Sequence, residues 1–269
     1  MGLSINTNIA SLQNNRRLDQ SLNRLKKSNE ELASGRRRLN PAELAIAEDL
    51  LARGDTAVVA TRNISDAVSF ANVAEGSLST VSDITGRLGE LAAQASNGTL
   101  SSEQRAALDQ EYQQLSAELD RISQSTEFNG QKLLNGSAQV SVQAGVDGSA
   151  SSQISLSLPG VSASSLGVGG TNLLTQESAQ QALTQVDSAR DTVSQARGEI
   201  GATVNRLGSA FNNLQTSIEN TRAAESRIRD VDFADATARN TQAKILTQVG
   251  AAVGAQANLS PAVVSRLLG

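Results

Sequence analysis

The side chains whose type and spacing come nearest to a metal or reactive site are three aspartates in the last part of the chain. Asp230, Asp232 and Asp235 place carboxylates close together. Carboxylate oxygens are the ligands that calcium prefers, but the ligand spacing and the closing glutamate of a calcium loop are missing. Aspartate is also a favoured cap at the start of a helix. We therefore interpret this cluster as a capped helix start.

Two short patterns suit the binding of an anion. The run Arg36-Arg37-Arg38 could contact a phosphate or a nucleic acid, yet three adjacent charges after a helix stop are typical of a solvated turn. The segment Gly167-Val-Gly-Gly170 has the glycines of a phosphate loop but lacks the lysine, the hydroxyl residue and the helix that should follow them. We expect a flexible connection there.

The composition excludes several classes of function. The chain has no histidine and no cysteine, so the usual metal ligands, the usual general base near neutral pH and the thiol nucleophile are all absent. We therefore predict no enzyme activity and no cofactor or metal. The net charge of −4 argues against a nucleic-acid partner. No stretch approaches the ~20 apolar residues of a membrane-spanning helix, and the first residues lack the regions of a signal peptide, so we expect neither membrane insertion nor a cleaved leader.

The elements that carry these residues are predicted to be long helices. Only 3 prolines occur, and alanine, leucine and glutamine are abundant, which favours uninterrupted helices. A narrow apolar stripe on the first helix ends at Ser34-Gly35, because glycine just past a periodic run is a usual helix stop. Asn40-Pro41 then marks a turn and a restart. The stripe consists of Leu18, Leu22, Leu25 and Leu32.

The middle of the chain predicts a helical hairpin followed by strands. Apolar residues advance by threes, fours and sevens over 42–96, Asn97-Gly98 stops this helix, and Ser101 or Ser102 caps the next one over 103–125. Between 135 and 175 the apolar residues alternate, which indicates a β-hairpin with a loose connection. The alternating residues are Val140 and Val142, then Ile154, Leu156 and Leu158.

The clearest signal is a heptad repeat over 176–226, a length of roughly 75 Å for a continuous helix. This repeat predicts a sustained coiled-coil seam. The predicted bundle core comprises Ile64, Val68, Leu78 and Leu88, with Val193, Ile200, Leu207, Phe211 and Leu214 on the later helix.

The last segment has apolar residues that nothing else in the chain would bury except the first helix. Amphipathic helices often pack only within their own chain, but stripes at both ends favour assembly with other copies. The predicted assembly interface comprises Leu18, Leu22, Leu25 and Leu32 with Ile245, Val249, Val253, Leu259, Val263, Leu267 and Leu268.

Together these patterns predict a mainly α fold. We expect a long antiparallel helical bundle or coiled coil with a small β-hairpin region and paired terminal helices. The expected divisions are a terminal helix at 1–41, a helical bundle core at 42–226 with the hairpin at about 136–175, and a second terminal helix at 227–269.

Three sets of motifs carry a resemblance to a known family. They are Leu3-Ser-Ile-Asn-Thr-Asn-Ile-Ala-Ser-Leu12 with Leu32-Ala-Ser-Gly35, then Thr126-Glu-Phe-Asn-Gly130-Gln-Lys-Leu-Leu134, then Ser226-Arg-Ile-Arg-Asp-Val-Asp-Phe233 with Ala255-Gln-Ala-Asn258. In these motifs and their order the chain resembles bacterial flagellin, in a short form that lacks the variable outer domains. The resemblance covers about 1–136 and 176–269.

The resemblance implies a structural protein of swimming motility. Such a subunit leaves the cell unfolded through the flagellar export apparatus and polymerises under a cap into an extracellular filament, with its paired termini lining the inner tube. The implied partners are other copies of the chain, an export chaperone, the filament cap and the hook-associated proteins. One departure from the family is a shorter stretch over 35–47, which carries Arg-Arg-Leu-Asn-Pro.

The resemblance also brings an animal innate immune receptor into consideration. Arg87, Leu91 and Glu111 match the receptor-facing residues of recognised members of the family. Gly86 and Gly89 replace longer polar side chains, which argues against recognition of this chain.

Two other functions remain as alternatives. A hook–filament junction protein, one of the hook-associated proteins, would share this architecture and act as an adaptor. A cytoplasmic coiled-coil module would form a discrete soluble oligomer and no polymer.

Overall fold

The computed structural model describes the backbone of residues 9–136 and 138–268, and the side chains of residues 9, 11–136 and 139–257. The chain forms two compact units, a terminal unit of Met1–Ala52 with Asn220–Gly269 and a central unit of Arg53–Glu219. The helices are α1 (Ile9–Ser34), α2 (Pro41–Ala95), α3 (Ser102–Ser125), α4 (Gln176–Arg229) and α5 (Phe233–Leu268). The strands are β1 (Glu127–Phe128), β2 (Gln131–Lys132), β3 (Ala138–Gln143) and β4 (Gln153–Leu158), with a 3₁₀ turn at Ala150–Ser152.

The predicted helix boundaries are confirmed, and their local causes are visible. Helix α1 ends before Gly35, whose φ of +68° is the left-handed conformation that glycine adopts without strain. Asn40 caps α2, because its Oδ1 accepts a hydrogen bond from the Glu43 backbone N–H at 2.8 Å. Of the two serines considered for α3, Ser101 is the cap, and it forms a capping box with Gln104.

The predicted β-hairpin is also confirmed, as β3 pairs antiparallel with β4 and Val142 lies opposite Ile154. A smaller hairpin, β1 with β2, was not predicted. Its turn is Asn129-Gly130, with φ of +50° and +79°, the pair of positive angles that a tight hairpin turn requires. Asparagine and glycine tolerate these angles better than other residues do.

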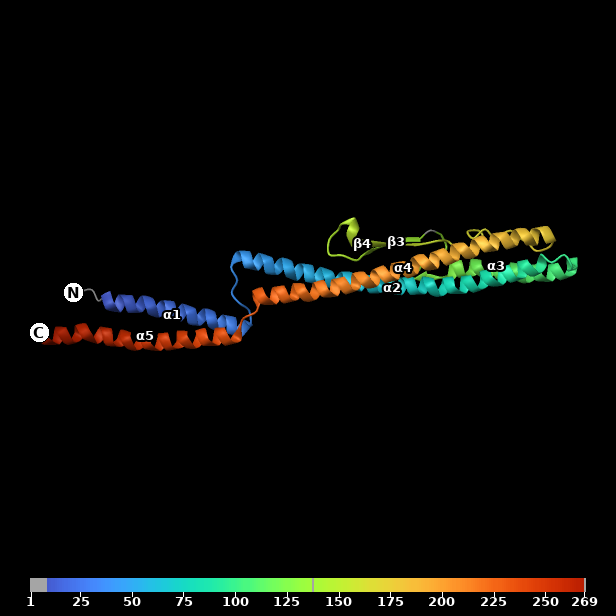
Figure 1. Cartoon of the computed structure of the whole chain (residues 1–269). Helices are drawn as coiled ribbons and strands as arrows, with labels where there is room; N and C mark the ends of the chain where they lie inside the picture. The colour runs from blue at the N-terminus through green and yellow to red at the C-terminus, as the bar shows by residue number, and fades with distance from the viewer. Residues whose placement is uncertain (1–8, 137, 269) are drawn as a thin grey trace. The chain divides into compact units, whose positions relative to one another are not determined.

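In the central unit, α2, α3 and α4 lie side by side with the β3–β4 hairpin against them (Figure 1). One buried cluster, with Leu88 and Ile200 among its members, extends over α2, α3, α4 and the chain after β4. A second cluster packs Ile64 and Leu207 against Val142 and Ile154 of the hairpin. Of the residues predicted for the bundle core, Ile64, Leu78, Leu88, Val193, Ile200, Leu207 and Leu214 are buried, whereas Val68 and Phe211 are partly buried and pack against the second cluster.

The chain between β4 and α4 is not the flexible connection that its glycines predicted. Val168 is buried between Gly167 and Gly170, which both have positive φ and so allow the chain to fold back on itself. Two carboxylates of α3 hold this segment: Asp120 accepts a hydrogen bond from the Ala163 backbone N–H, and Asp109 accepts one from the Leu173 backbone N–H, both at 2.8 Å. The prediction failed because glycine spacing reveals backbone freedom but not the surface on which a segment packs.

Within the described ranges, no helix has both the length and the apolar character that crossing a membrane requires.

Candidate functional site

The paired helices α1 and α5 of the terminal unit form the candidate site. They run antiparallel and side by side (Figure 1). The side chains buried along their contact are small or polar rather than large and apolar. These buried residues are Ser21, Ser28, Ala236, Asn240 and Ala243.

Hydrogen bonds join the two helices at three places. The Asn14 amide donates to the Gly250 carbonyl at 2.8 Å, and the Ser28 hydroxyl donates to the Ala236 carbonyl at 3.0 Å. The amide of Asn240 donates to the Asn29 side-chain oxygen at 2.6 Å. The pair is therefore held largely by close approach and polar contacts, each worth about 1 kcal/mol net.

Several large apolar side chains of the pair remain on its outside. On α5, Ile245 is 53 % exposed and Val249 is 52 % exposed, and shallow apolar grooves follow both helices, one along Ala234, Ala238 and Ile245 and one along Leu22 and Leu25. Of the predicted interface residues, Leu22, Ile245, Val249 and Val253 are exposed, Leu18, Leu25 and Leu32 are half-buried, and Leu259, Val263, Leu267 and Leu268 lie outside the described side chains.

The two connections of the terminal unit are hydrogen-bonded to each other. Arg36 and Asp230 form an isolated antiparallel bridge. On one side of it the Arg37 N–H donates to the Arg229 carbonyl at 2.7 Å, and on the other the Val231 N–H donates to the Gly35 carbonyl at 3.1 Å. The three arginines at 36–38 are exposed, as expected for a solvated turn, but sequence reasoning missed their backbone pairing with residues almost two hundred positions away.

A partly buried arginine completes this junction. The Arg229 side chain is only 16 % exposed and forms ion pairs with Glu48 at 2.9 Å and with Glu225 at 3.2 Å. Because Glu48 belongs to the first turns of α2, these turns group with the terminal helices rather than with the bundle. The units divide near residues 52 and 220, whereas the sequence predicted divisions at 41 and 226.

The aspartate cluster starts α5. The Asp232 carboxylate accepts hydrogen bonds from the backbone N–H groups of Ala234 at 2.9 Å and Asp235 at 3.2 Å, so the predicted cap is confirmed. Asp235 forms an ion pair with Arg239, and Asp230 accepts a hydrogen bond from Ser226. Among the described residues, no group of three or more carboxylates is arranged to hold a metal ion.

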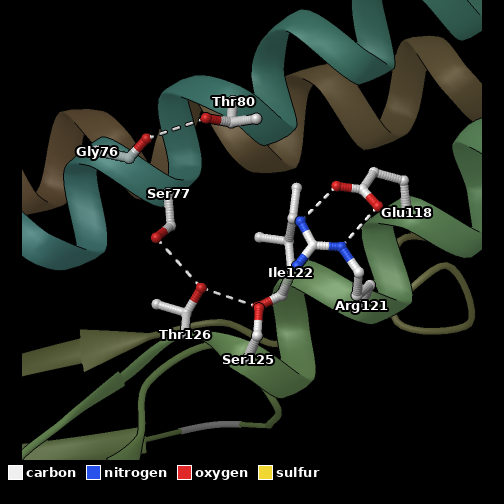
Figure 2. Close-up of polar contacts among 8 residues, drawn as sticks. All are labelled: Gly76, Ser77, Thr80, Glu118, Arg121, Ile122, Ser125 and Thr126. Carbon is white, nitrogen blue, oxygen red and sulfur yellow. Dashed lines mark hydrogen bonds and ion pairs between the residues drawn. The ribbon is translucent and has the colours of Figure 1, made fainter.

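Thr126, the first residue of the motif that runs to Leu134, closes α3 and ties it to α2 (Figure 2). Its hydroxyl donates to the Ile122 carbonyl at 2.8 Å and lies 3.1 Å from the Ser77 hydroxyl of α2. One turn earlier, Arg121 binds the Glu118 carboxylate through two nitrogens, which raises the pKa of Arg121 and lowers that of Glu118. Thr126 therefore fixes the end of α3 and its contact with α2.

The residues predicted to face an immune receptor are only partly on the surface. Arg87 and Glu111 are exposed and form an ion pair at 2.8 Å between α2 and α3. Leu91 does not face outward, because it is 1 % exposed and packs in the larger core cluster. Gly89 is also buried, and a Cβ placed there would lie 3.5 Å from Val186 of α4, whereas a Cβ at Gly86 would meet open space.

Comparison with known sequences identifies the family. Residues 5–139 match the bacterial flagellin N-terminal helical region, and residues 183–268 match the bacterial flagellin C-terminal helical region. The flagellin of Halalkalibacterium halodurans is 37 % identical over 270 aligned positions, which cover 98 % of this chain and 99 % of that protein. The flagellar filament 30.7 kDa core protein of Treponema maltophilum is 35 % identical, with the same coverage of both chains.

Solved structures agree. Bacillus cereus flagellin is similar with a TM-score of 0.50 and 33 % identity, over 57 % of this chain and 88 % of that chain. A putative flagellar hook-associated protein from Vibrio parahaemolyticus has a TM-score of 0.57 over 70 % of this chain and 98 % of that one, but at 15 % identity it shares the fold alone. The matches to both helical regions and to relatives of nearly equal length lead to one conclusion: the chain belongs to the bacterial flagellin family.

Proposed function

We propose that this chain is a structural subunit that polymerises into the flagellar filament of a swimming bacterium. The observation that carries the proposal is the packing of α1 against α5. The buried residues of this contact are small or polar, whereas the apolar residues Ile245 and Val249 remain about half exposed. Soluble monomers do expose single apolar side chains, but a continuous apolar face on a long helix marks an interaction surface. The relative from Treponema maltophilum is itself named as a filament core protein.

The energetics favour burial of this face against other copies. Full burial of a valine or isoleucine side chain is worth about 1.5–3 kcal/mol, so each half-exposed residue offers about 1 kcal/mol more on assembly. Ile245, Val249 and Val253 recur every four residues on α5, which places them along one side of the helix. A helical polymer presents the same face many times, so these contributions add along the filament.

The finer parts of the proposal concern export and location. We infer that the chain leaves the cell unfolded through the flagellar export apparatus, without a cleaved signal peptide, and that it meets an export chaperone, the filament cap and the hook-associated proteins. The weakly packed terminal pair supports this inference, because a contact of small residues costs little to open before transit. The flagellin family is structural, and we infer no catalytic role.

The hook–filament junction function is the second candidate, favoured by the fold shared with the hook-associated protein. Sequence identity favours the filament subunit. The chain is 37 % identical to a flagellin of nearly the same length, but only 15 % identical to the hook-associated protein. A junction protein would form a short adaptor and would not polymerise in bulk.

The test is the substitution Ile245→Asp in the full-length chain. Because Ile245 is exposed in the monomer, its replacement should leave the thermal unfolding midpoint nearly unchanged. In a filament the new charge would be buried without a partner, so sedimentable polymer should be lost. Gln248→Asp, at an exposed polar position of the same helix, is the matched control and should polymerise normally.

The outcomes separate the candidate functions. Long filaments of the parent protein, seen by electron microscopy and absent in Ile245→Asp, support the filament subunit. If the Ile245→Asp variant sediments normally, the exposed apolar face of α5 is not part of the assembly interface. A discrete soluble oligomer of the parent would favour the coiled-coil module, and short caps on hook ends would favour the junction protein.

A further inference from the structure

Two glycines of α5 form a notch that holds one side chain of α1. Gly250 and Gly254 lie one helical turn apart, and the Asn14 amide nitrogen is 2.8 Å from the Gly250 carbonyl oxygen. A Cβ at Gly254 would lie only 2.7 Å from the same amide nitrogen. A side chain at residue 254 would therefore displace the Asn14 amide from this position.

The notch belongs to a repeated register. Asn14 and Ser28 are separated by fourteen residues on α1, and their acceptors Gly250 and Ala236 are separated by fourteen residues on α5. Fourteen residues are two heptads, so both contacts lie on the same side of each helix. A slip of one helix past the other by a single turn would break both hydrogen bonds together.

We propose that Asn14 is a positioning residue: by seating its amide between Gly250 and Gly254, it fixes the register of α1 against α5. The other specific contacts, which are the Arg36–Asp230 bridge and the hydrogen bonds of Asn29 with Asn240 and of Ser28 with Ala236, all lie toward the end of α1 and the start of α5. Asn14 acts near the opposite end of the pair, where the buried side chains are small and interlock little. A polar side chain on an otherwise weakly specified helix contact is a known way to select one register, at some cost in stability.

The register matters for assembly, a consequence that rests on the proposed function. The outward apolar residues lie on two different helices, Leu22 on α1 and Ile245 and Val249 on α5. Only one alignment of the helices presents these residues as one repeating surface. A slipped pair would offer neighbouring copies a mismatched face.

The test reads the register directly by disulfide trapping. The chain has no native cysteine, and a Cβ at Gly250 would lie 3.9 Å from the Cβ of Leu18, within the ~3.5–4.5 Å span of a disulfide. Leu18→Cys with Gly250→Cys reports the native register, and Leu18→Cys with Leu246→Cys reports a slip of one turn. Each pair is placed in four full-length backgrounds: parent, Asn14→Ala, Gly254→Ala, and the two combined.

The notch predicts a specific non-additivity. Gly254→Ala should lower the ratio of native to slipped cross-link about fivefold, the equivalent of one lost hydrogen bond, because its methyl group displaces the Asn14 amide. In the Asn14→Ala background the same substitution should have no such effect, since the amide is gone. A mere gain in helix propensity from alanine would act equally in both backgrounds.

Two results would overturn the inference: an equal effect of Gly254→Ala with and without Asn14, or an unchanged ratio in Asn14→Ala alone. The ratio is measured in both monomer and sedimented polymer. If neither the native chain nor the double-cysteine variant in the parent background, with its disulfide reduced, forms filaments, the proposed function fails. The ratio in the monomer still decides whether Asn14 sets the register.

Discussion

The hydroxyl of Tyr112 on α3 lies 2.8 Å from the hydroxyl of Thr171, which joins the larger core cluster to the segment that precedes α4. Thr171 in turn donates to the Val168 carbonyl at 2.6 Å. Tyr112 is fully buried, and this burial raises the pKa of its phenol above the ordinary 10.0. The contact therefore links packing, hydrogen bonding and ionisation at one residue.

This linkage predicts a loss of stability at alkaline pH. Because the pKa of Tyr112 is higher in the folded than in the unfolded chain, its contribution is fully present below pH 10.0 and is lost as the pH rises through the folded value. Tyr112 is the sole tyrosine and tryptophan is absent, so the ultraviolet absorbance of tyrosinate titrates this group alone.

The matched control is Tyr112→Phe, which keeps the ring and removes the hydroxyl. It should cost about 1 kcal/mol near neutral pH, from the lost hydrogen bond, and should abolish this part of the alkaline loss. A tyrosinate titration at the ordinary pKa in the folded chain would contradict the burial of Tyr112.

Leu207→Asp should destabilise the central unit by on the order of 4 kcal/mol. Leu207 is fully buried in the second core cluster between α2, α4 and the hairpin, so the aspartate would place an unpaired charge there. Ser209→Asp, at an exposed position two residues later, should change stability by less than about 0.5 kcal/mol. Circular dichroism melting of both full-length variants measures the difference, and equal midpoints would show that Leu207 does not support the bundle.

The terminal helices should be cut by protease in the monomer and protected in the polymer. The contact between α1 and α5 is small and polar, and isolated helices are marginal in water unless an apolar face is packed. Leu25→Asp, or removal of residues 259–269, should abolish filaments while the central unit stays folded. Limited proteolysis with mass spectrometry locates the cuts, and equal protection of the termini in both states would refute their role in assembly.

Activation of the innate immune receptor should be weak or absent. Arg87 and Glu111 form an ion pair with each other, so neither charge is free for a receptor. Leu91 is buried, and Gly86 has no side chain to offer. Gly86→Gln should raise signalling in a reporter-cell assay because its Cβ would meet open space. Gly89→Arg should help less than the sequence suggested, since residue 89 faces Val186 and a long side chain there must bend past α4. Full potency of the native monomer would contradict this prediction.

The helices, their ends and the β3–β4 hairpin could be predicted because their causes are local. Heptad and alternating patterns, the stop at Gly35 and the cap at Asp232 act within a few residues of the chain. The motifs that resemble flagellin are likewise short contiguous stretches, so the order of the residues was enough to identify the family.

Tertiary structure alone decided which surface each pattern meets. The packing of Val168 against the core, the burial of Leu91 and Gly89, the pairing of Arg36 with Asp230 and the seat of Asn14 at Gly250 all join residues that are distant in sequence. The same limit applies to the terminal stripes. An apolar face that packs on a partner helix and one that stays open for another copy have the same periodicity. Only the docking of α1 against α5, through small residues and hydrogen bonds, determines that Ile245 and Val249 lie outside.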